Sequence, residues 1–207
     1  RAGEPEFQLS TATRIVGARL HTARQLLLRN LRSERRSGNA DAATMDAAAQ
    51  ELRHLAGQLA EAGSMDALRG FEGLATRIYF RAFAQLLPDG FTFDRRTRRP
   101  PKDPVNALLS LGYTLLTNHV HAFLVAEQLN PHVGTLHELR PGRPSLAADL
   151  TEEFRAPVVE ALVLSLLWKG LIDPSDFELP DEPDQACLLT KDALRVYLGH
   201  FARTMAG

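Results

Sequence analysis

Apolar side chains recur at helical spacing along almost the whole chain. In the segment after Asp41, for example, Met45, Leu52 and Leu59 are seven residues apart. That spacing places them on one face of an α-helix. We find no run that alternates apolar and polar residues and is rich in β-branched side chains, as a half-exposed strand would be. The fold class predicted from this pattern is all-α.

Capping residues and helix breakers divide the chain into six predicted helices. Ser, Thr and Asp side chains accept hydrogen bonds from the free N–H groups of a first turn, whereas Gly and Pro end or kink a helix. From predicted N-cap to predicted end, the helices run from Ser10 or Thr11 to Arg32, from Asp41 to Gly63, from Ser64 to Leu87, from Asp103 to Leu129, from Ser145 to Lys169 with a kink at Pro157, and from Thr190 to beyond Met205.

The length and composition are those of one domain with its own core. The chain has 207 residues, of which 44% are hydrophobic, and a chain of this size buries a sizeable apolar core. It starts at Arg1 rather than at methionine, and Gly3 and Pro5 give its first residues a loop-like character. We therefore expect a fragment in which residues 1–9 are a linker remnant and residues 10–207 form one helical domain.

Cysteine usage and hydropathy indicate the compartment. The single cysteine, Cys187, excludes an intrachain disulfide and a metal site of several thiolates, which favours a reducing cytoplasm. The longest apolar run, Val158–Trp168, is interrupted by Glu160 and is too short to cross a bilayer. We expect a soluble protein with no membrane partner. A net charge of -1 does not indicate nucleic-acid binding, so local clusters of cations must decide that point.

A carboxylate interrupts the apolar stripe of the third predicted helix, whose members are Leu68, Glu72, Ala75 and Tyr79. A charge at such a position normally finds a cation or a metal ion, because burying it alone is costly. A salt bridge at the helix edge is the alternative, and the spacing alone favours it. Gly70 and Gly73 flank Glu72 and weaken the helix; close approach of another group is one reason for them.

A second acidic cluster comprises Asp149, Glu152 and Glu153, which share one helical turn beside the apolar stripe. Like charges repel at this distance, and a hard divalent cation such as Mg²⁺ or Mn²⁺ between them relieves the repulsion. A solvated acidic face is the commoner explanation. His137 lies in the preceding loop, where a neutral imidazole completes a mixed nitrogen and oxygen site.

Arginines gather in two stretches of the chain, and two interpretations of their role are equally open. They are Arg95, Arg96, Arg98 and Arg99 before the fourth helix, and Arg140 and Arg143 close to His137. Guanidinium groups bind phosphates well, so these arginines are candidates for holding DNA beside a metal. A solvated basic loop is the alternative.

Four segments carry ordered motifs: Gly70–Ala75, Arg99–Ser110, Asn130–His137 and Arg143–Arg155. Together they resemble the catalytic domain of the CRISPR-associated integrases that acquire spacers, and the last two resemble that family's metal-site signature. The resemblance covers the chain well from about Gly70 to Lys169. It implies that Glu72, His137 and an acid of the turn from Asp149 to Glu152 bind Mg²⁺ or Mn²⁺. Which of Asp149 and Glu152 contacts the metal stays open, and Glu153 is a weaker candidate.

The resemblance also implies a reaction and partners. The reaction is strand transfer, in which a 3′-hydroxyl of captured DNA attacks a phosphodiester at the edge of a CRISPR repeat, and endonuclease activity is the related reverse reaction. The implied partners are double-stranded DNA and a small CRISPR-associated subunit in the cytoplasm of a prokaryote. Family members dimerise through an N-terminal β-rich domain, which we do not expect within these 207 residues, and some members are fused to a reverse transcriptase or a nuclease.

Two other functions remain open at this point. One is a non-catalytic helical module that binds DNA or scaffolds the spacer-acquisition complex. The other is a protein-interaction bundle with a solvated acidic face, which has affinity for neither metal nor DNA.

Overall fold

The computed structural model describes residues 4–37, 42–138, 140, 142–182 and 184–206. Its main helices are α1 (Pro5–Ser37), α2 (Ala42–Gln58), α3 (Met65–Ala84), α4 (Pro104–Ala126), α5 (Ser145–Phe154), α6 (Ala161–Trp168) and α7 (Lys191–Ala206). Three short helical turns join them: η1 (Leu59–Glu61), η2 (Arg155–Glu160) and η3 (Pro174–Asp176). The prediction of an all-α fold is confirmed.

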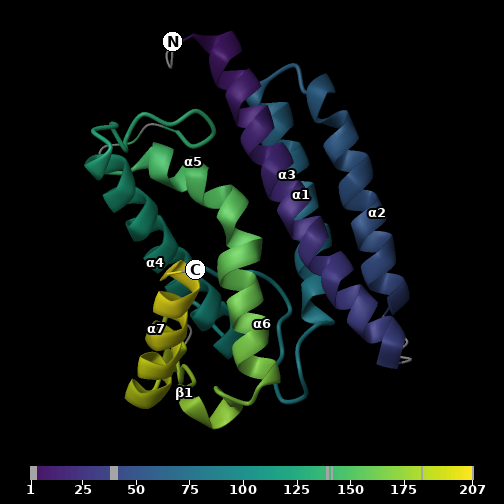
Figure 1. Ribbon diagram of the computed structural model, residues 1–207, viewed down its shortest axis with the longest axis vertical. Helices are drawn as coiled ribbons and strands as arrows, with labels where there is room; N and C mark the ends of the chain where they lie inside the picture. The colour runs from purple at the N-terminus through teal and green to yellow at the C-terminus, as the bar shows by residue number, and fades with distance from the viewer. Residues whose placement is uncertain (1–3, 38–41, 139, 141, 183, 207) are drawn as a thin grey trace.

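The long helix α1 packs against both halves of the molecule (Figure 1). On one side it contacts α2 and α3, and on the other it contacts α5 and η2. Helices α4, α6 and α7 complete the second half, where α4 packs against α5 and η2 and α6 packs against α7. The apolar faces of these helices form one continuous core. This arrangement brings α3 and α5, which carry the acidic residues singled out in the sequence, to the same helix α1.

Three of the predicted caps form as expected. The side chains of Ser64, Asp103 and Thr190 accept hydrogen bonds from the backbone N–H groups of Ala67, Asn106 and Ala193, respectively. Each satisfies a donor that the first turn of a helix leaves free. The predicted cap Asp41 lies outside the described residues.

Two predicted caps are wrong. Helix α1 begins at Pro5, so Ser10 and Thr11 lie inside it, and residues 5–9 of the predicted linker belong to the helix. Proline suits a first helical turn, and Leu9 extends the apolar stripe back to the core. Ser145 is the first residue of α5 rather than its cap, because its hydroxyl donates to the carbonyl oxygen of Glu138 instead.

The predicted kink at Pro157 is a π-helical turn, η2 (Arg155–Glu160), between α5 and α6. Proline has no N–H group to donate to the preceding turn, and the wider π-turn is a common way to accommodate such an interruption. The consequence for the site is that Arg155 and Glu160, at the two ends of η2, both face the interior of the molecule.

The structure also contains a small antiparallel ribbon that the sequence pattern did not predict. Strands β1 (Phe177–Glu178) and β2 (Leu188–Leu189) pair through Phe177 with Leu189 and Glu178 with Leu188. Strands of two residues are too short to show an alternating pattern.

Helix α4 is long and apolar enough to cross a membrane, and it is the one such helix in the described parts of the chain. Its first turns pack in the core, where Val105, Leu108 and Leu109 are fully buried, whereas Phe123 and Val125 near its end are exposed.

Candidate metal centre

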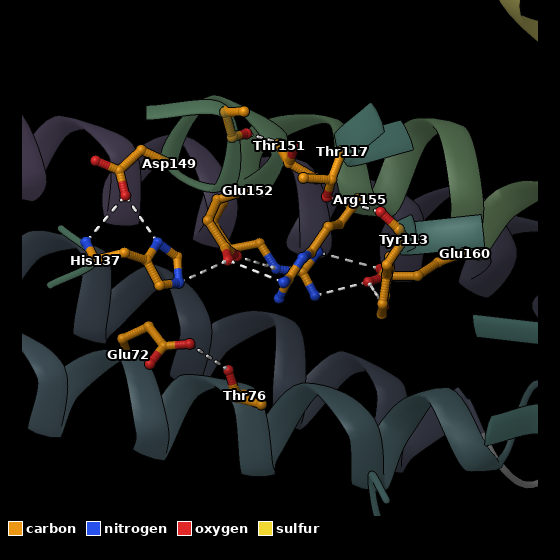
Figure 2. A network of polar contacts seen from close by, with 12 residues as sticks. Glu72, Thr76, Tyr113, Thr117, His137, Asp149, Thr151, Glu152, Arg155 and Glu160 are labelled. Carbon is orange, nitrogen blue, oxygen red and sulfur yellow. Dashed lines mark hydrogen bonds and ion pairs between the residues drawn. The ribbon is translucent and has the colours of Figure 1, made fainter. Parts of the chain in front are cut away.

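The loop before α5 is held by one buried carboxylate, that of Asp149. Its Oδ2 atom accepts hydrogen bonds from the backbone N–H groups of Thr135 (2.6 Å) and Leu136 (3.0 Å). Its Oδ1 atom accepts from the backbone N–H of His137 (3.0 Å) and lies 2.7 Å from Nδ1 of the same residue (Figure 2). Both oxygens of Asp149 are therefore occupied within the protein.

The contact with Asp149 sets the tautomer of His137. An ionised carboxylate only accepts hydrogen bonds, so Nδ1 carries the proton and donates it to Oδ1 of Asp149. In the neutral ring, Nε2 then presents its lone pair on the other side. A lone pair on a half-buried imidazole that a carboxylate orients is the usual form of a histidine metal ligand.

The same contacts keep Asp149 ionised. Burial alone raises the pKa of this carboxyl, since Asp149 is 0% exposed. The hydrogen bonds from the His137 ring and from the three backbone N–H groups lower it by more, so its pKa lies below the usual range of an aspartate. The charge needed to orient His137 is thus present at neutral pH.

Gly134 permits the loop to approach α5 this closely. A Cβ atom at this position would lie 2.7 Å from Oδ2 of Asp149 and 2.8 Å from the carbonyl oxygen of Ser145. No side chain fits there without displacing the carboxylate or the backbone of α5.

Glu152 lies one turn after Asp149 and is 4% exposed. Its Oε1 atom is 3.1 Å from a guanidinium nitrogen of Arg155 and 3.9 Å from Nε2 of His137. Its Oε2 atom is buried and has no hydrogen-bond partner among the described residues; the Nε atom of Arg19 lies 4.0 Å from it. An orphaned buried carboxylate oxygen is an observation that calls for a ligand.

Glu72 reaches the same place from α3. It is half-buried, and its Oε1 atom accepts a hydrogen bond of 3.2 Å from Thr76 (Figure 2). Glu72, His137 and Glu152 line one cavity of about 310 Å³. Three residues that lie far apart in the sequence thus converge. Gly70 and Gly73 border open space, so packing within the described protein does not require them to be glycines.

The predicted DNA-binding arginines divide into three groups. Arg98, Arg140 and Arg143 line the cavity, as does Arg69, which the sequence analysis did not include. Arg95 and Arg99 are exposed beside this region but do not line the cavity. Arg140 binds Glu138 through a contact of 2.8 Å, so its charge is partly compensated.

Arg96 has an internal role. Its guanidinium donates to Oδ1 of Asn106 (2.6 Å) and to Oγ of Ser110 (2.9 Å), and it lies over the ring of Tyr113. Burial lowers the pKa of Arg96 to about 10; Tyr113 opposes this shift, and the positive charges of Arg98 and Arg155 add to it. The geometry ties this arginine to the start of α4 rather than to the cavity.

The side chains fit a hard divalent cation in kind. Two carboxylates and one imidazole nitrogen are a donor set that Mg²⁺ or Mn²⁺ accepts, with manganese the more tolerant of nitrogen. Within the described ranges, no three such groups stand close enough to share an ion as they are placed, and Arg155 occupies one oxygen of Glu152. The residues that can hold an ion are Glu72, Nε2 of His137 and Glu152, with Asp149 orienting the imidazole from behind. Glu153 is half-buried and lines no part of this cavity.

A buried charge network behind Glu152 was missed by the sequence analysis. Glu160 accepts hydrogen bonds from Arg19, Tyr79 and Tyr113, and none of these three was singled out for chemistry. Burial lowers the pKa of Arg19, but Glu160 and the two tyrosines raise it by more, so this arginine stays charged. The signal in the sequence was Glu160 itself, which interrupts the most apolar run of the chain.

A larger cavity lies elsewhere. It has a volume of about 710 Å³ and lies between α2 and α3, lined by Leu55, Leu74, Ile78 and neighbouring polar residues. The surface of its walls is mainly apolar, and its charged lining residues are Glu51, Arg77 and Arg81, with His54 beside them. It thus has one carboxylate among the described residues, whereas Glu72, Glu138 and Glu152 all line the smaller cavity.

The comparison with known protein families decides the identity of the fold. Residues 1–203 match the family described as "CRISPR associated protein Cas1". The chain belongs to the Cas1 family. Among relatives, the CRISPR-associated endonuclease Cas1 3 of Thermus thermophilus is 55% identical over 113 residues, which are 55% of this chain and 34% of that protein.

A second relative is a fusion protein. The CRISPR-associated exonuclease Cas4/endonuclease Cas1 fusion of Geobacter sulfurreducens is 36% identical over 211 residues, covering 99% of this chain and 36% of that protein. The chain therefore spans 34% to 36% of the length of these two relatives. Both relatives are named as endonucleases.

Two solved structures have the same fold. The Cas1-containing chain of a partial Cas6-RT-Cas1–Cas2 complex superposes with a TM-score of 0.86 at 33% identity, over 98% of this chain and 59% of that chain. A casposase bound to integration product superposes with a TM-score of 0.81 at 26% identity, over 98% of this chain and 54% of that one.

Proposed function

We propose that this Cas1 protein is a CRISPR integrase, which joins the 3′-hydroxyl ends of captured DNA to the CRISPR repeat. DNA endonuclease activity is the related reaction. The observation that carries the proposal is the convergence of Glu72, His137 and Glu152 on one cavity that also has arginines in its wall. The likeness to a casposase bound to integration product supports strand transfer as the reaction class.

Glu72, Nε2 of His137 and Glu152 would hold a magnesium or manganese ion. Such an ion supplies Lewis-acid stabilisation of the charge that develops on the oxygens of the reacting phosphate. The remaining requirements fall to the protein. Asp149 holds the imidazole in one tautomer and one orientation, which a ligand position needs.

The arginines in the cavity wall provide the electrostatic part of substrate binding. Arg98 and Arg143 are exposed and line the cavity with Glu72 and His137, so the phosphates of a DNA strand can approach them from solvent. These contacts place a phosphodiester in the cavity beside the carboxylates. Positioning of this kind supplies much of the rate in phosphoryl transfer.

The reaction requires no covalent link to the protein. The 3′-oxygen of the captured DNA forms a bond to a phosphorus atom of the repeat. The bond between that phosphorus and the 3′-oxygen of the preceding nucleotide in the same DNA strand breaks. The proton lost by the attacking hydroxyl balances the proton gained by the leaving oxygen. With water in place of the attacking hydroxyl, the same displacement is hydrolysis, which accounts for an endonuclease activity.

The proposed partners follow from the relatives. One solved neighbour is a Cas6-RT-Cas1–Cas2 complex and one relative is a Cas4/Cas1 fusion. We propose double-stranded DNA, a small Cas2-type subunit and a prokaryotic cytoplasm for this protein. Dimerisation through an N-terminal domain, and fusion to a reverse transcriptase or nuclease, remain predictions.

The test is joining of a labelled 3′-hydroxyl DNA to a CRISPR-bearing plasmid in Mn²⁺, with the partner subunit present. Glu72→Ala and His137→Ala are compared with Glu153→Ala, which alters a carboxylate of the same acidic cluster outside the cavity. We expect joining by the wild type and the control, and none by the two site variants, with DNA binding retained by all.

The same assay separates the alternative functions. If wild-type protein binds DNA and joins none, the non-catalytic DNA-binding module is the better description. If the site variants join DNA as well as the wild type, Glu72 and His137 are not the catalytic centre. If neither DNA nor metal binds, the protein-interaction bundle is favoured.

A further inference from the structure

Glu160 is a fully buried carboxylate with four hydrogen-bond contacts. Its Oε1 atom accepts from Arg19 (2.7 Å) and from the Tyr113 hydroxyl (2.6 Å). Its Oε2 atom accepts from the other terminal nitrogen of Arg19 (3.2 Å) and from the Tyr79 hydroxyl (2.5 Å). The pairing with Arg19 is thus bidentate, and the carboxylate is 0% exposed. Both terminal nitrogens of Arg19 are engaged on the side away from the cavity.

Arg19 lies between this carboxylate and the cavity. Its Nε atom is 4.0 Å from Oε2 of Glu152, which is outside hydrogen-bond distance. That Oε2 atom is the buried oxygen that lacks a hydrogen-bond partner in the described part of the chain. Two carboxylates therefore flank one guanidinium, and only Glu160 is bound to it at short range.

A guanidinium that closed on Glu152 would compete with a divalent cation. Arg–carboxylate pairs are commonly bidentate, so a pair of this kind takes up both carboxylate oxygens. Arg155 already engages Oε1 of Glu152 at 3.1 Å. If Arg19 also engaged Oε2, no oxygen of Glu152 would remain for an ion.

We propose that Glu160 is a positioning residue for the metal centre: by binding Arg19 from behind, it holds the guanidinium away from Glu152 and leaves Oε2 of Glu152 available to the cation. Tyr79 supports this role, because its hydroxyl donates to Oε2 of Glu160. Tyr113 does the same for Oε1 (Figure 2). Core stability alone does not require the pair, since a well-packed apolar pair often stabilises as much as a buried ion pair. The inference rests on the proposed function, in that it takes Glu152 to be a metal ligand.

The test measures Mn²⁺ binding directly, by the electron paramagnetic resonance signal of free Mn²⁺ during titration of the folded protein. In Glu160→Gln the carboxylate charge is lost, and Arg19 is expected to turn to Glu152. Removal of such an outer contact lowers metal affinity about 10- to 100-fold. In the double variant Glu160→Gln, Arg19→Met the competing guanidinium is absent, and we expect affinity to return to within about threefold of the wild type.

The double variant separates positioning from a general loss of structure. A purely structural role for Glu160 predicts that the double variant binds Mn²⁺ no better than Glu160→Gln, and this result would overturn the inference. Unchanged affinity in folded Glu160→Gln would overturn it as well. If Glu160→Gln does not fold, Arg19→Met alone decides: retained or tighter Mn²⁺ binding supports the inference, and weaker binding overturns it.

Failure of the proposed function gives a different result. If the wild-type protein binds no Mn²⁺, the proposed metal centre is wrong, and so is the positioning role of Glu160. If the wild-type protein binds Mn²⁺ but joins no DNA, the integrase function is wrong. The comparison of Mn²⁺ affinity between the variants still tests the role of Glu160.

Discussion

The Nδ1 atom of His137 lies 2.7 Å from Oδ1 of Asp149, and the same carboxylate accepts three backbone N–H groups of the loop that carries His137. One buried side chain thus fixes both the backbone and the ring of the histidine. In the proposed metal centre, this relationship supports different roles for the two acids of the turn: Asp149 would orient the imidazole, and Glu152, whose Oε2 atom has no hydrogen bond from the described residues, would bind the ion.

Asp149→Asn tests the orienting role. Asparagine has one carbonyl oxygen, so its NH₂ group must face either the backbone donors or the donating Nδ1 of His137. We expect Mn²⁺ affinity to fall about 10- to 100-fold, with joining recovered in part at saturating Mn²⁺. Titration of Mn²⁺ binding checks this. Asp173→Asn is the control, because Asp173 caps the distant turn η3; equal affinities in the two variants would contradict the assignment.

Gly134→Ala tests the close approach of the loop to α5. The added Cβ would lie 2.7 Å from Oδ2 of Asp149 and against the backbone of Ser145. Overpacking of this kind typically costs about 1–3 kcal/mol. We expect a lower free energy of unfolding in denaturant titration together with weaker Mn²⁺ binding. A variant as stable as the wild type would show that the loop and α5 lie further apart than these distances.

Gly73→Ala is predicted to have the opposite effect on stability. Gly73 is an exposed glycine inside α3 with open space beside it, where alanine is favoured by about 1 kcal/mol. We expect a higher free energy of unfolding. DNA joining measured on the same variant shows whether the open backbone beside Glu72 is used by the substrate, in which case joining falls although the fold is more stable. A loss of stability would contradict the open geometry around Gly73.

Arg98→Gln and Arg96→Gln are predicted to separate DNA binding from folding. Arg98 is exposed in the cavity wall, whereas Arg96 binds Asn106 and Ser110. Removing one cation that neutralises a DNA phosphate reduces the slope of log affinity against log salt by about 0.9. We expect this reduction for Arg98→Gln and a lower melting temperature with an unchanged slope for Arg96→Gln. The reverse pattern would show that Arg96 contacts DNA.

Cys187 is predicted to react slowly in the folded protein. Burial raises the pKa of its thiol from 9.0 to about 11, with a smaller effect of Asp103. Because the reactive thiolate fraction falls about tenfold for each pKa unit, alkylation at pH 8 should be slowed by about two orders of magnitude relative to the unfolded chain. The folded state favours the neutral thiol, so the contribution of Cys187 to stability is present below pH 9 and is lost as the pH rises toward 11. Cys187→Ala should lack that loss.

Local features of the fold were predictable because their causes are local. The spacing of apolar residues predicts the helices, and Asp103 followed by Pro104 predicts the start of α4, since a cap bonds to a donor three residues away. Ser145 was wrongly assigned as a cap because its hydroxyl binds the carbonyl of Glu138, in the preceding loop. Helix propensity and apolar periodicity do not indicate that the carbonyl oxygen of Glu138 competes for the Ser145 hydroxyl.

The sequence indicated the candidate residues but not their arrangement, and that they form a metal site stays a prediction. Charges beside apolar stripes made Glu72 and Glu152 candidates, and the resemblance to the integrase family selected them together with His137. The division of roles between Asp149 and Glu152 depends on which carboxylate faces the loop and which faces the cavity. Glu160 was out of reach because its partner Arg19 is 141 residues away in the chain, and ion pairs of that separation exist only after the fold has formed.

The most direct test of the central claim is the position of manganese in a crystal of the protein soaked in Mn²⁺, located by its anomalous scattering. We predict one ion in the cavity, bound by Glu72, Nε2 of His137 and Glu152, with Asp149 still bound to Nδ1 behind it. An ion bound by Asp149 or Glu153 instead, or no anomalous peak in this cavity at saturating Mn²⁺, would contradict this metal centre.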